Sequence, residues 1–416
     1  MIKRKEINPS FFLALQEEEN SGVSYRNILL KKQILDFLVS EGNSTLSDIA
    51  KHLNVSIPKV NELVTELMDE GLIRDFGKIT SGVGRKPNIY GLEPSSAHFL
   101  GIEVKRDRIN MGLMDFSENF THFQENIPFI LENTPQALEQ LLHEIESYIK
   151  TLKIAKGKLM GMGLNLTGRI NSELGYSYSF FHFNEEPLSR IIEKRIGIPT
   201  HIENDTRAMA FGEFHRGSVT TEKDVLFINL DEGMGMGIMI DGNLYYGKSG
   251  FAGEFGHIPL LNNDIICHCG KKGCLETAAS GAAITREIKR RLTEGATSIL
   301  TQEFKDTSKI KLQHVIQASL DDDMLAIELI EEAGEKIGKG IAALINLFNP
   351  ELIILGGALA ATDAYIRLPI KSAIHKYSLS LVHNDTQLRM SKLNERAGII
   401  GACLLVRKKM LSIPTT

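Results

Sequence analysis

Residues 255–276 read FGHIPLLNNDIICHCGKKGCLE, and no other stretch of this chain is as informative. Three of the four cysteines in the 416 residues fall here, and a histidine precedes the first of them by ten positions. Thiolates and imidazoles hold Zn²⁺ in a tetrahedron when the metal fixes a loop, so we predict a zinc site with the ligands His257, Cys267, Cys269 and Cys274. Gly270 and Gly273 allow the short loop to fold back so that the sulfurs converge.

Two other interpretations of the cysteines are open at the level of sequence. They could be buried or redox-active thiols, or Cys267 and Cys269 could form a disulfide. A disulfide between such close neighbours would be strained, and it would leave the third thiol without a partner. We therefore favour zinc. Because four protein ligands leave no open coordination position, we expect the metal to shape the loop that carries Glu276 rather than to take part in chemistry.

Length and composition limit the class of protein. A chain of 416 residues with 43% hydrophobic residues is expected to fold into two or three domains with large cores. The apolar stretch at residues 11–15 is too short for a signal peptide, and no run approaches the ~20 apolar residues of a membrane span. Together with the clustered cysteines, these features indicate a cytoplasmic protein that has no membrane partner. The net charge of −5 means that any contact with DNA must come from a local patch.

The N-terminal part of the chain predicts a winged helix-turn-helix domain at residues 26–93, preceded by a loosely ordered arm at residues 1–25. Apolar residues recur at helical spacing in three segments, which we expect to be helices: Ile28 to Leu38, with an end near Gly42; Leu46 to Leu53; and Val60 to Leu67, with an end at Gly71. Ser56 is a candidate cap for the third helix, and Pro58 suits its first turn. Two strand-like runs follow, and a turn-rich tip separates them. This order of helices and hairpin is the plan of a winged DNA-binding domain.

Contacts with DNA are expected from two parts of this domain. The third helix would lie in the major groove, and the basic hairpin tip would reach a narrow minor groove. The residues placed to face DNA are Ser56, Lys59, Asn61 and Thr65 on the helix, and Arg85 and Lys86 at the tip. Acidic and basic residues are nearly balanced over residues 1–95, so a small helical interaction module is the alternative. We favour DNA.

From residue 94 onward, strand-like runs alternate with amphipathic helices, which is typical of an α/β fold. The pattern of two strands followed by α/β units occurs twice. We expect a first α/β lobe at residues 94–216, completed by about residues 395–416, and a second lobe with the zinc loop at residues 217–394. Two such lobes predict a cleft between them, which is the usual place for a small ligand.

Three segments carry polar side chains suited to binding a polyol. Carboxylates accept hydroxyl protons, and an Asn amide both donates and accepts, so together they can hold a sugar ring from several sides. One ring nitrogen of His257 could bind the metal while the other meets a hydroxyl. For Asn204 and Asp205 alone, a helix cap would be the simpler interpretation. The residues expected to bind the sugar are Asn204, Asp205, Glu254, His257 and Glu276.

These runs resemble the ROK family of repressors, open reading frames and sugar kinases, and the resemblance extends from about residue 26 to the C-terminus. The matching runs are residues 203–205, 252–257 and 346–357, together with the cysteine loop. The resemblance implies a winged helix-turn-helix followed by a two-lobed sugar kinase fold of the actin-like, ribonuclease H-like type. It implies structural zinc on the four ligands given above and sugar contacts from the five polar residues. In the family's kinases the residue that matches Asp205 is the general base.

The segments that would hold ATP depart from the pattern of the family's kinases. Those kinases show an Asp-x-Gly-Gly-Thr turn after the first strand, where this chain has Glu103–Arg108 without glycine or threonine. Their second phosphate turn, Gly-Thr-Gly-x-Gly-x-Gly, corresponds here to Asp231–Gly237. Asp231 and Glu232 place carboxylates beside a polyanion, and two like charges ~4 Å apart repel by about 4 kcal/mol at an effective dielectric constant near 20. We therefore assign no catalytic residue and expect a degenerate kinase.

The sequence thus predicts a sugar-responsive transcriptional regulator, and the resemblance favours a repressor. The expected partners are operator DNA, a monosaccharide or sugar-phosphate effector bound in the cleft, and further copies of the chain in a homodimer or homotetramer. The N-terminal winged domain looks like that of the family's repressors rather than its stand-alone kinases. An ATP-dependent sugar kinase with an added DNA module is the alternative. A protein-binding scaffold with a vestigial sugar site is a third possibility.

Overall fold

The computed structural model describes residues 11, 23–78 and 87–411, and their contacts divide them into two compact units. The first unit contains the described residues up to Leu166, together with Leu174–Ile202 and the chain from Ala402. The second contains Thr167–Glu173 and Glu203–Gly401. Residues 205–216 therefore group with the second unit, whereas the sequence led us to place them in the first lobe. The domain limits given above stay predictions.

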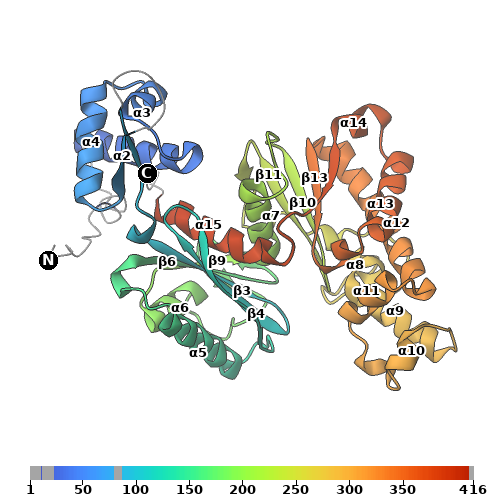
Figure 1. Ribbon diagram of the computed structural model, residues 1–416. Helices are drawn as coiled ribbons and strands as arrows, with labels where there is room; N and C mark the ends of the chain where they lie inside the picture. Colours follow the sequence, from blue (N-terminus) through green and yellow to red (C-terminus); the bar gives the residue numbers. More distant parts are fainter. Residues whose placement is uncertain (1–10, 12–22, 79–86, 412–416) are drawn as a thin grey trace. The chain divides into compact units, whose positions relative to one another are not determined.

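The N-terminal part of the first unit forms three helices and a β-hairpin, as the apolar spacing predicts (Figure 1). The elements are α2 (Val23–Glu41), α3 (Leu46–Leu53), α4 (Ile57–Asp69), β1 (Ile73–Lys78) and β2 (Asn88–Leu92). Thr45 caps α3 through a reciprocal capping box with Asp48, and Asn54 ends α3 in the left-handed conformation with φ 52°. Ser56 occupies the N-cap position of α4, but its side chain makes no capping hydrogen bond.

The first unit also holds a five-stranded sheet in the order β5-β4-β3-β6-β9. Its strands are β3 (His98–Val104), β4 (Arg108–Asp115), β5 (Phe120–Pro128), β6 (Leu159–Leu166) and β9 (Thr200–Asn204). Figure 1 shows α5 (Pro135–Thr151) and α6 (Leu188–Ile196) on one face and α15 (Ala397–Met410) on the other. Gly163 permits the close approach of α15, because a Cβ at this position would stand 2.2 Å from the carbonyl oxygen of Ala402.

The second unit is built on a sheet of the same plan, with the order β12-β11-β10-β13-β14. Its strands are β10 (Val225–Leu230), β11 (Met234–Ile240), β12 (Asn243–Leu244), β13 (Leu352–Gly356) and β14 (Gln387–Met390). In both sheets the central strand pairs antiparallel on one side and parallel on the other. Figure 1 shows α7 (Asp205–Arg216) on one face of this sheet and α12 (Met324–Phe348) on the other. The two repeated α/β sheets confirm the expected fold class.

Further elements complete the two units. The helices are α8 (Glu276–Ala279), α9 (Gly281–Thr293), α10 (Leu300–Glu303), α11 (Leu312–Leu320), α13 (Ala364–Tyr377) and α14 (Ser380–Asp385). Two short strands are β7 (Ile170–Asn171) and β8 (Tyr176–Ser177), and the 3₁₀ helices are η1 (Pro94–Ser96), η2 (Lys156–Lys158), η3 (Phe255–His257), η4 (Thr307–Lys309), η5 (Ala358–Thr362) and η6 (Asn394–Arg396).

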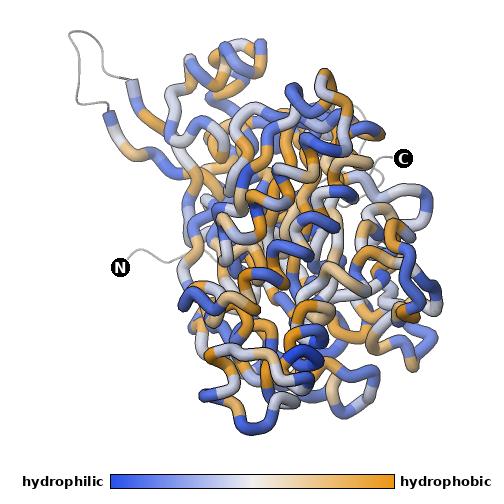
Figure 2. The backbone as a smooth tube through the Cα atoms, turned by 90° about the vertical axis from the view of Figure 1, so that its right-hand side faces the viewer, coloured by the Kyte–Doolittle hydropathy of each residue, from blue (hydrophilic) through white to orange (hydrophobic). Residues whose placement is uncertain are grey.

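Hydrophobic residues collect on the strands and on the inner faces of the helices, and hydrophilic residues are common along the outer loops (Figure 2). In the second unit, one continuous core joins β10, β11 and β13 to the apolar side of α12. Burial of this apolar surface is the main force that fixes the loops at its edge. No helix within residues 23–78 and 87–411 is both long enough and apolar enough to cross a membrane.

Candidate metal and effector site

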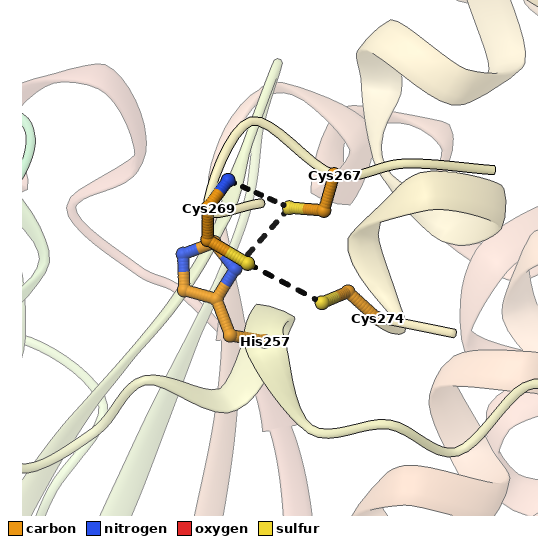
Figure 3. Close-up of side chains that lie close together, drawn as sticks. All are labelled: His257, Cys267, Cys269 and Cys274. Atoms are coloured by element: carbon orange, nitrogen blue, oxygen red, sulfur yellow. Dashed lines mark hydrogen bonds between the residues drawn. The ribbon is translucent and has the colours of Figure 1, made fainter. Parts of the chain in front are cut away.

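The three cysteines and the histidine of residues 255–276 come together at one point of the second unit (Figure 3). Their four ligand atoms all lie within 4.8 Å of one another. Cys267 Sγ is 3.5 Å from His257 Nδ1, and Cys269 Sγ is 3.6 Å from Cys274 Sγ. In a tetrahedral zinc site, bond lengths require ~3.8 Å between two sulfurs and ~3.5 Å between sulfur and nitrogen. The observed spacing therefore fits a four-coordinate metal.

The backbone of the loop brings these side chains together. The N–H of Cys267 donates to the carbonyl of Lys271 and the N–H of Gly270 donates to that of Cys267, both at 2.8 Å, which closes a tight turn. Gly270 and Gly273 have φ of 83° and 78°, in the region that disfavours other residues. A Cβ on Gly273 would also lie 2.6 Å from the carbonyl oxygen of Leu261. Both glycines are thus required for the convergence of the sulfurs.

All four cysteines of the chain are free thiols, so no disulfide competes with a metal. Burial raises the pKa of Cys267 and of Cys274, whereas the backbone N–H of Lys271 lowers the pKa of the exposed Cys269. A metal binds thiolates, and its charge would offset the cost of ionising the two buried thiols. Cys403 is fully buried in α15, and its thiol lies 3.6 Å from the backbone carbonyls of Phe99 and Gly112, so core packing explains this cysteine.

Among the predicted sugar-binding residues, His257 belongs to this group of possible ligands, and Glu254 and Glu276 lie beside it. Oε1 of Glu276 is 2.8 Å from Cys267 Sγ and 3.3 Å from His257 Nδ1. Oε2 of Glu254 is 3.6 Å from His257 Nε2. The two ring nitrogens of His257 therefore face different groups: Nδ1 faces the sulfurs and Glu276, and Nε2 faces Glu254. This geometry is compatible with the dual role expected from the sequence.

Asn204 and Asp205 stand at the start of α7. Oδ1 of Asn204 accepts the N–H of Arg207 at 3.1 Å, and Nδ2 donates to the carbonyl of Gly168 at 3.0 Å. Asn204 is thus a helix cap, the simpler interpretation considered above. One amide hydrogen and one lone pair of the side chain remain for a ligand. Asp205 Oδ1 accepts the N–H of Thr206 at 2.7 Å.

Strand β11 lies between the start of α7 and the segment Gly253–His257, and it contacts both. A Cβ on Gly235 would stand 2.5 Å from Thr206 Oγ1, so this glycine lets α7 rest on the strand. The next residue, Met236, donates its N–H to the carbonyl of Gly253, which precedes Glu254. A Cβ on Gly256 would be 2.7 Å from the carbonyl oxygen of Met234. Gly235 and Gly256 therefore allow close packing around the candidate site.

Arg207 is the main residue that sequence reasoning missed. Its guanidinium forms a buried ion pair with Glu203 at 2.7 Å, and the two side chains are 5% and 2% exposed. It also donates to the carbonyls of Gly250 at 2.7 Å and Ile170 at 3.0 Å. Glu203 in turn accepts the hydroxyl of Tyr246 at 3.1 Å, and both burial and this carboxylate raise the pKa of Tyr246. Glu203 lies at the end of β9 and Arg207 in the first turn of α7, so the opposite charges four residues apart in sequence were the available signal.

Polar groups form hydrogen bonds with one another in the two segments that correspond to the phosphate turns of the kinases. Glu103 is buried in β3, where it accepts the amide of Asn110 at 2.8 Å. In the turn after β10, the N–H of Glu232 donates to the carboxylate of Asp231 at 2.8 Å. The first two N–H groups of α9 donate to the carbonyls of Asp231 and Glu232. Backbone donors of the kind that cradle phosphates are thus used within the turn.

The residues predicted to contact DNA at α4 are its N-cap, Ser56, and three residues within the helix. Ser56, Asn61 and Thr65 are exposed, and Lys59 is half-buried with its ammonium 2.8 Å from Glu62. The hydroxyl of Thr65 donates to the carbonyl of Asn61 at 2.7 Å. The buried side of α4 carries Val60, Leu63, Val64 and Leu67. Arg85 and Lys86 at the hairpin tip lie outside the described residues, so their role stays a prediction.

Residues 99–409 match the ROK family, and residues 29–74 match a winged helix-turn-helix DNA-binding domain. The chain belongs to the ROK family. Its two α/β sheets are thus the ROK sugar-kinase-like fold, and its three helices and hairpin are the family's winged DNA-binding domain, as the resemblance implied.

Members of the ROK family that are similar over most of this chain include regulators. The xylose repressor of Caldicellulosiruptor bescii is 29% identical over 391 residues, covering 93% of this chain and 96% of the relative. A crystal structure of a ROK family transcriptional regulator, described as a homologue of the E. coli MLC protein, has a TM-score of 0.77 at 28% identity and covers 92% of this chain and 95% of its own. A glucokinase of Halalkalibacterium halodurans is 32% identical over 258 residues, covering 61% of this chain and 78% of the relative.

Proposed function

We propose that this ROK protein is a transcriptional repressor that binds operator DNA through α4 and the β1/β2 hairpin and responds to a sugar. The observation that carries the proposal is the coexistence, in one chain, of a winged helix-turn-helix and a ROK fold with carboxylates in its phosphate turn. The similarity to a xylose repressor over nearly the whole chain supports it. The similarity to a glucokinase covers 61% of the chain.

The effector is proposed to be a monosaccharide or a sugar phosphate bound by Asn204, Asp205, Glu254, His257 and Glu276. Three of these side chains are carboxylates, which accept hydrogen bonds from hydroxyl groups. The remaining amide hydrogen and lone pair of Asn204 can form hydrogen bonds with one further hydroxyl. The Arg207–Glu203 pair and β11 give this set a rigid base. A rigid, partly buried polar set is what sugar recognition needs, because a ring with many hydroxyls must match each donor and acceptor.

Zinc is the proposed metal for His257, Cys267, Cys269 and Cys274. Three thiolates and one imidazole form a donor set that suits zinc. Magnesium and calcium prefer oxygen ligands instead. With four protein ligands the metal would be structural, and it would fix His257 and the start of α8 beside the sugar-binding carboxylates. Reduced thiols of this kind persist in the cytoplasm, where we propose that the protein works.

We also propose that the chain has lost kinase activity. The exposed Glu232 and the half-exposed Asp231 would face the phosphates of a nucleotide, and α9 already donates its first N–H groups to protein carbonyls. Asp205 would then act as a hydrogen-bond acceptor rather than as a base. The alternative, an ATP-dependent sugar kinase, is favoured by the similarity to glucokinases.

Binding to two half-sites requires at least two copies, so we propose a homodimer or a homotetramer. Half-sites of winged helix-turn-helix dimers lie about one DNA turn, ~34 Å, apart, and a small change in the spacing of the paired helices weakens binding to both. Sedimentation of the full chain with and without DNA measures the number of copies. A monomer that binds DNA with full affinity would contradict this part of the proposal.

A combined experiment tests the function. A random pool of duplexes is selected on the full-length protein, and the enriched duplex is used in fluorescence anisotropy. A thermal-shift panel of D-xylose, D-glucose, N-acetyl-D-glucosamine and their phosphates identifies the effector. The expected result is release of the duplex by the sugar that raises the melting temperature, with no phosphate transferred from ATP to that sugar. Robust phosphoryl transfer, or failure to enrich any duplex, would overturn the proposal.

A further inference from the structure

Oε1 of Glu276 lies close to atoms of three side chains, and only one of these side chains, His268, is outside the proposed metal set. Its Oε1 is 2.8 Å from Cys267 Sγ, 3.3 Å from His257 Nδ1 and 3.1 Å from His268 Nδ1. The carboxylate itself is 10% exposed, whereas the His268 side chain is 70% exposed. His268 stands between two cysteine ligands in sequence, and its ring meets that of His257 edge to face at 5.2 Å.

Metal binding would leave Cys267 and His257 unable to donate a hydrogen bond to Oε1 of Glu276. A metal-bound cysteine is a thiolate with no proton to donate, and a metal-bound imidazole nitrogen uses its lone pair for the metal and carries no hydrogen. Cys267 and His257 would therefore cease to hold Oε1 of Glu276. The thiolate of Cys267 would also repel the carboxylate at this distance. Without another donor, Glu276 would turn away from the position seen here.

We propose that His268 is the positioning residue for Glu276: its Nδ1–H holds Oε1 in the metal-bound protein, so that Oε2 stays directed at the effector. Oε2 already lies toward Gly233, 4.0 Å from the place where a Cβ on that residue would stand. Because Gly233 has no side chain, there is room beside this oxygen for a sugar hydroxyl. The inference rests on the proposed function, since it specifies how the same site presents one of its carboxylates.

A second arrangement of the same groups is the competing explanation. His257, His268 and Glu276 also bring their ligand atoms within 4.8 Å of one another, so His268 could be a metal ligand rather than a positioning residue. The three-thiolate set is the stronger donor set for zinc, and both sets need His257. The two explanations differ in one measurable property: a positioning residue can be replaced without loss of the metal.

The test uses the full-length protein with three substitutions. His268→Leu removes the donor, and His268→Asn keeps an amide hydrogen at the place of Nδ1. Lys271→Ala is the matched control, because Lys271 is an exposed residue of the same loop whose side chain is not among the groups around Glu276. Effector affinity is measured by calorimetry with whichever of D-xylose, D-glucose and N-acetyl-D-glucosamine raises the melting temperature of the wild-type chain. Bound zinc is counted by chelator competition.

We expect His268→Leu to weaken effector binding about five- to tenfold, which is the effect of losing one charge-assisted hydrogen bond at a partly exposed site. His268→Asn should restore affinity to within about twofold of wild type, as should Lys271→Ala, and all three should keep one zinc per chain. Equal affinity of His268→Leu and wild type would overturn the proposal. Loss of zinc in His268→Leu would also overturn it and assign His268 to the metal.

A crystal structure determined without sugar tests the role of His268 independently of the proposed sugar response. In a crystal structure of the zinc-loaded wild-type protein, Nδ1 of His268 should lie within hydrogen-bond distance of Oε1 of Glu276. A structure in which Glu276 has turned away from His268 would refute the positioning role whether or not any sugar binds. If no sugar of the panel binds but this contact is present, the effector assignment fails and the placement of Glu276 by His268 stands.

Discussion

Replacing Arg207 with methionine should be among the most damaging single changes in the second unit. Arg207 and Glu203 are 5% and 2% exposed, and the substitution leaves the carboxylate buried without its cation. Methionine fills a similar volume, so the effect reports the lost charge and hydrogen bonds more than a cavity. Removing one partner of a buried pair costs about 3–5 kcal/mol, and the carbonyls of Gly250 and Ile170 lose their donors as well.

The assay is urea unfolding followed by far-ultraviolet circular dichroism, because the chain contains no tryptophan. Arg290→Met is the control: Arg290 pairs with Glu287 and Glu294 on the surface, where its side chain is 53% exposed, so its loss should destabilise the protein far less than the loss of Arg207. Combining Arg207→Met with Glu203→Gln should cost less than the sum of the two single changes, by about 1 kcal/mol or more.

Equal destabilisation by Arg207→Met and Arg290→Met would refute the reasoning, because it would mean that the buried pair contributes no more than an exposed one. Additive costs in the double variant would show that Glu203 and Arg207 do not act as a pair. Effector affinity gives a second readout. Since Arg207 holds Gly250 and Ile170 at the start of α7, the single variant should also bind the sugar more weakly at temperatures where it remains folded.

Four further outcomes are expected. Cys269→Ser should reduce bound zinc to well below one per chain, as counted with a chelating dye, since it removes one of four ligands. Asn61→Ala should weaken duplex binding in anisotropy by about 1–3 kcal/mol and leave the sugar-induced thermal shift unchanged. Glu232→Gly should raise the affinity for an ATP analogue in calorimetry by about tenfold or more, because it removes a negative charge from the phosphate turn. Burial raises the pKa of Glu222, but hydrogen bonds from backbone N–H groups and from a guanidinium lower it by more. The net result is a pKa of about 2 instead of 4.5. The depressed folded-state pKa stabilises the protein fully above pH 4.5 and progressively less as the pH falls toward 2, so Glu222→Gln should flatten acid unfolding in that window.

Each of these expectations has an outcome that would contradict it. Full zinc content in Cys269→Ser would exclude that sulfur as a ligand. Unchanged duplex affinity of Asn61→Ala would show that this side chain contributes nothing to DNA binding. Unchanged nucleotide affinity in Glu232→Gly would show that charge is not what excludes ATP. Identical acid transitions of Glu222→Gln and wild type would show that this carboxylate carries no pH-dependent stability.

The sequence by itself determined the helices of the winged domain and the composition of the metal loop. Apolar spacing sets the buried side of α4, and Thr45 with Asp48 fixes the start of α3 through contacts only three residues apart. Cys267, Cys269 and Cys274 must lie close together because the chain between them is too short to separate them. Such local features are determined by neighbours along the chain, which a sequence displays directly.

Only the tertiary structure decided which groups surround each functional side chain. Arg207 reaches carbonyls 37 and 43 residues away, and Asn204 reaches Gly168 across 36 residues, because β7, α7 and β11 meet in the folded unit. The contact of His268 with Glu276 likewise depends on how the cysteine loop folds back over α8. These pairings follow from the packing of a shared apolar core, whose geometry is not encoded in the spacing of any single segment.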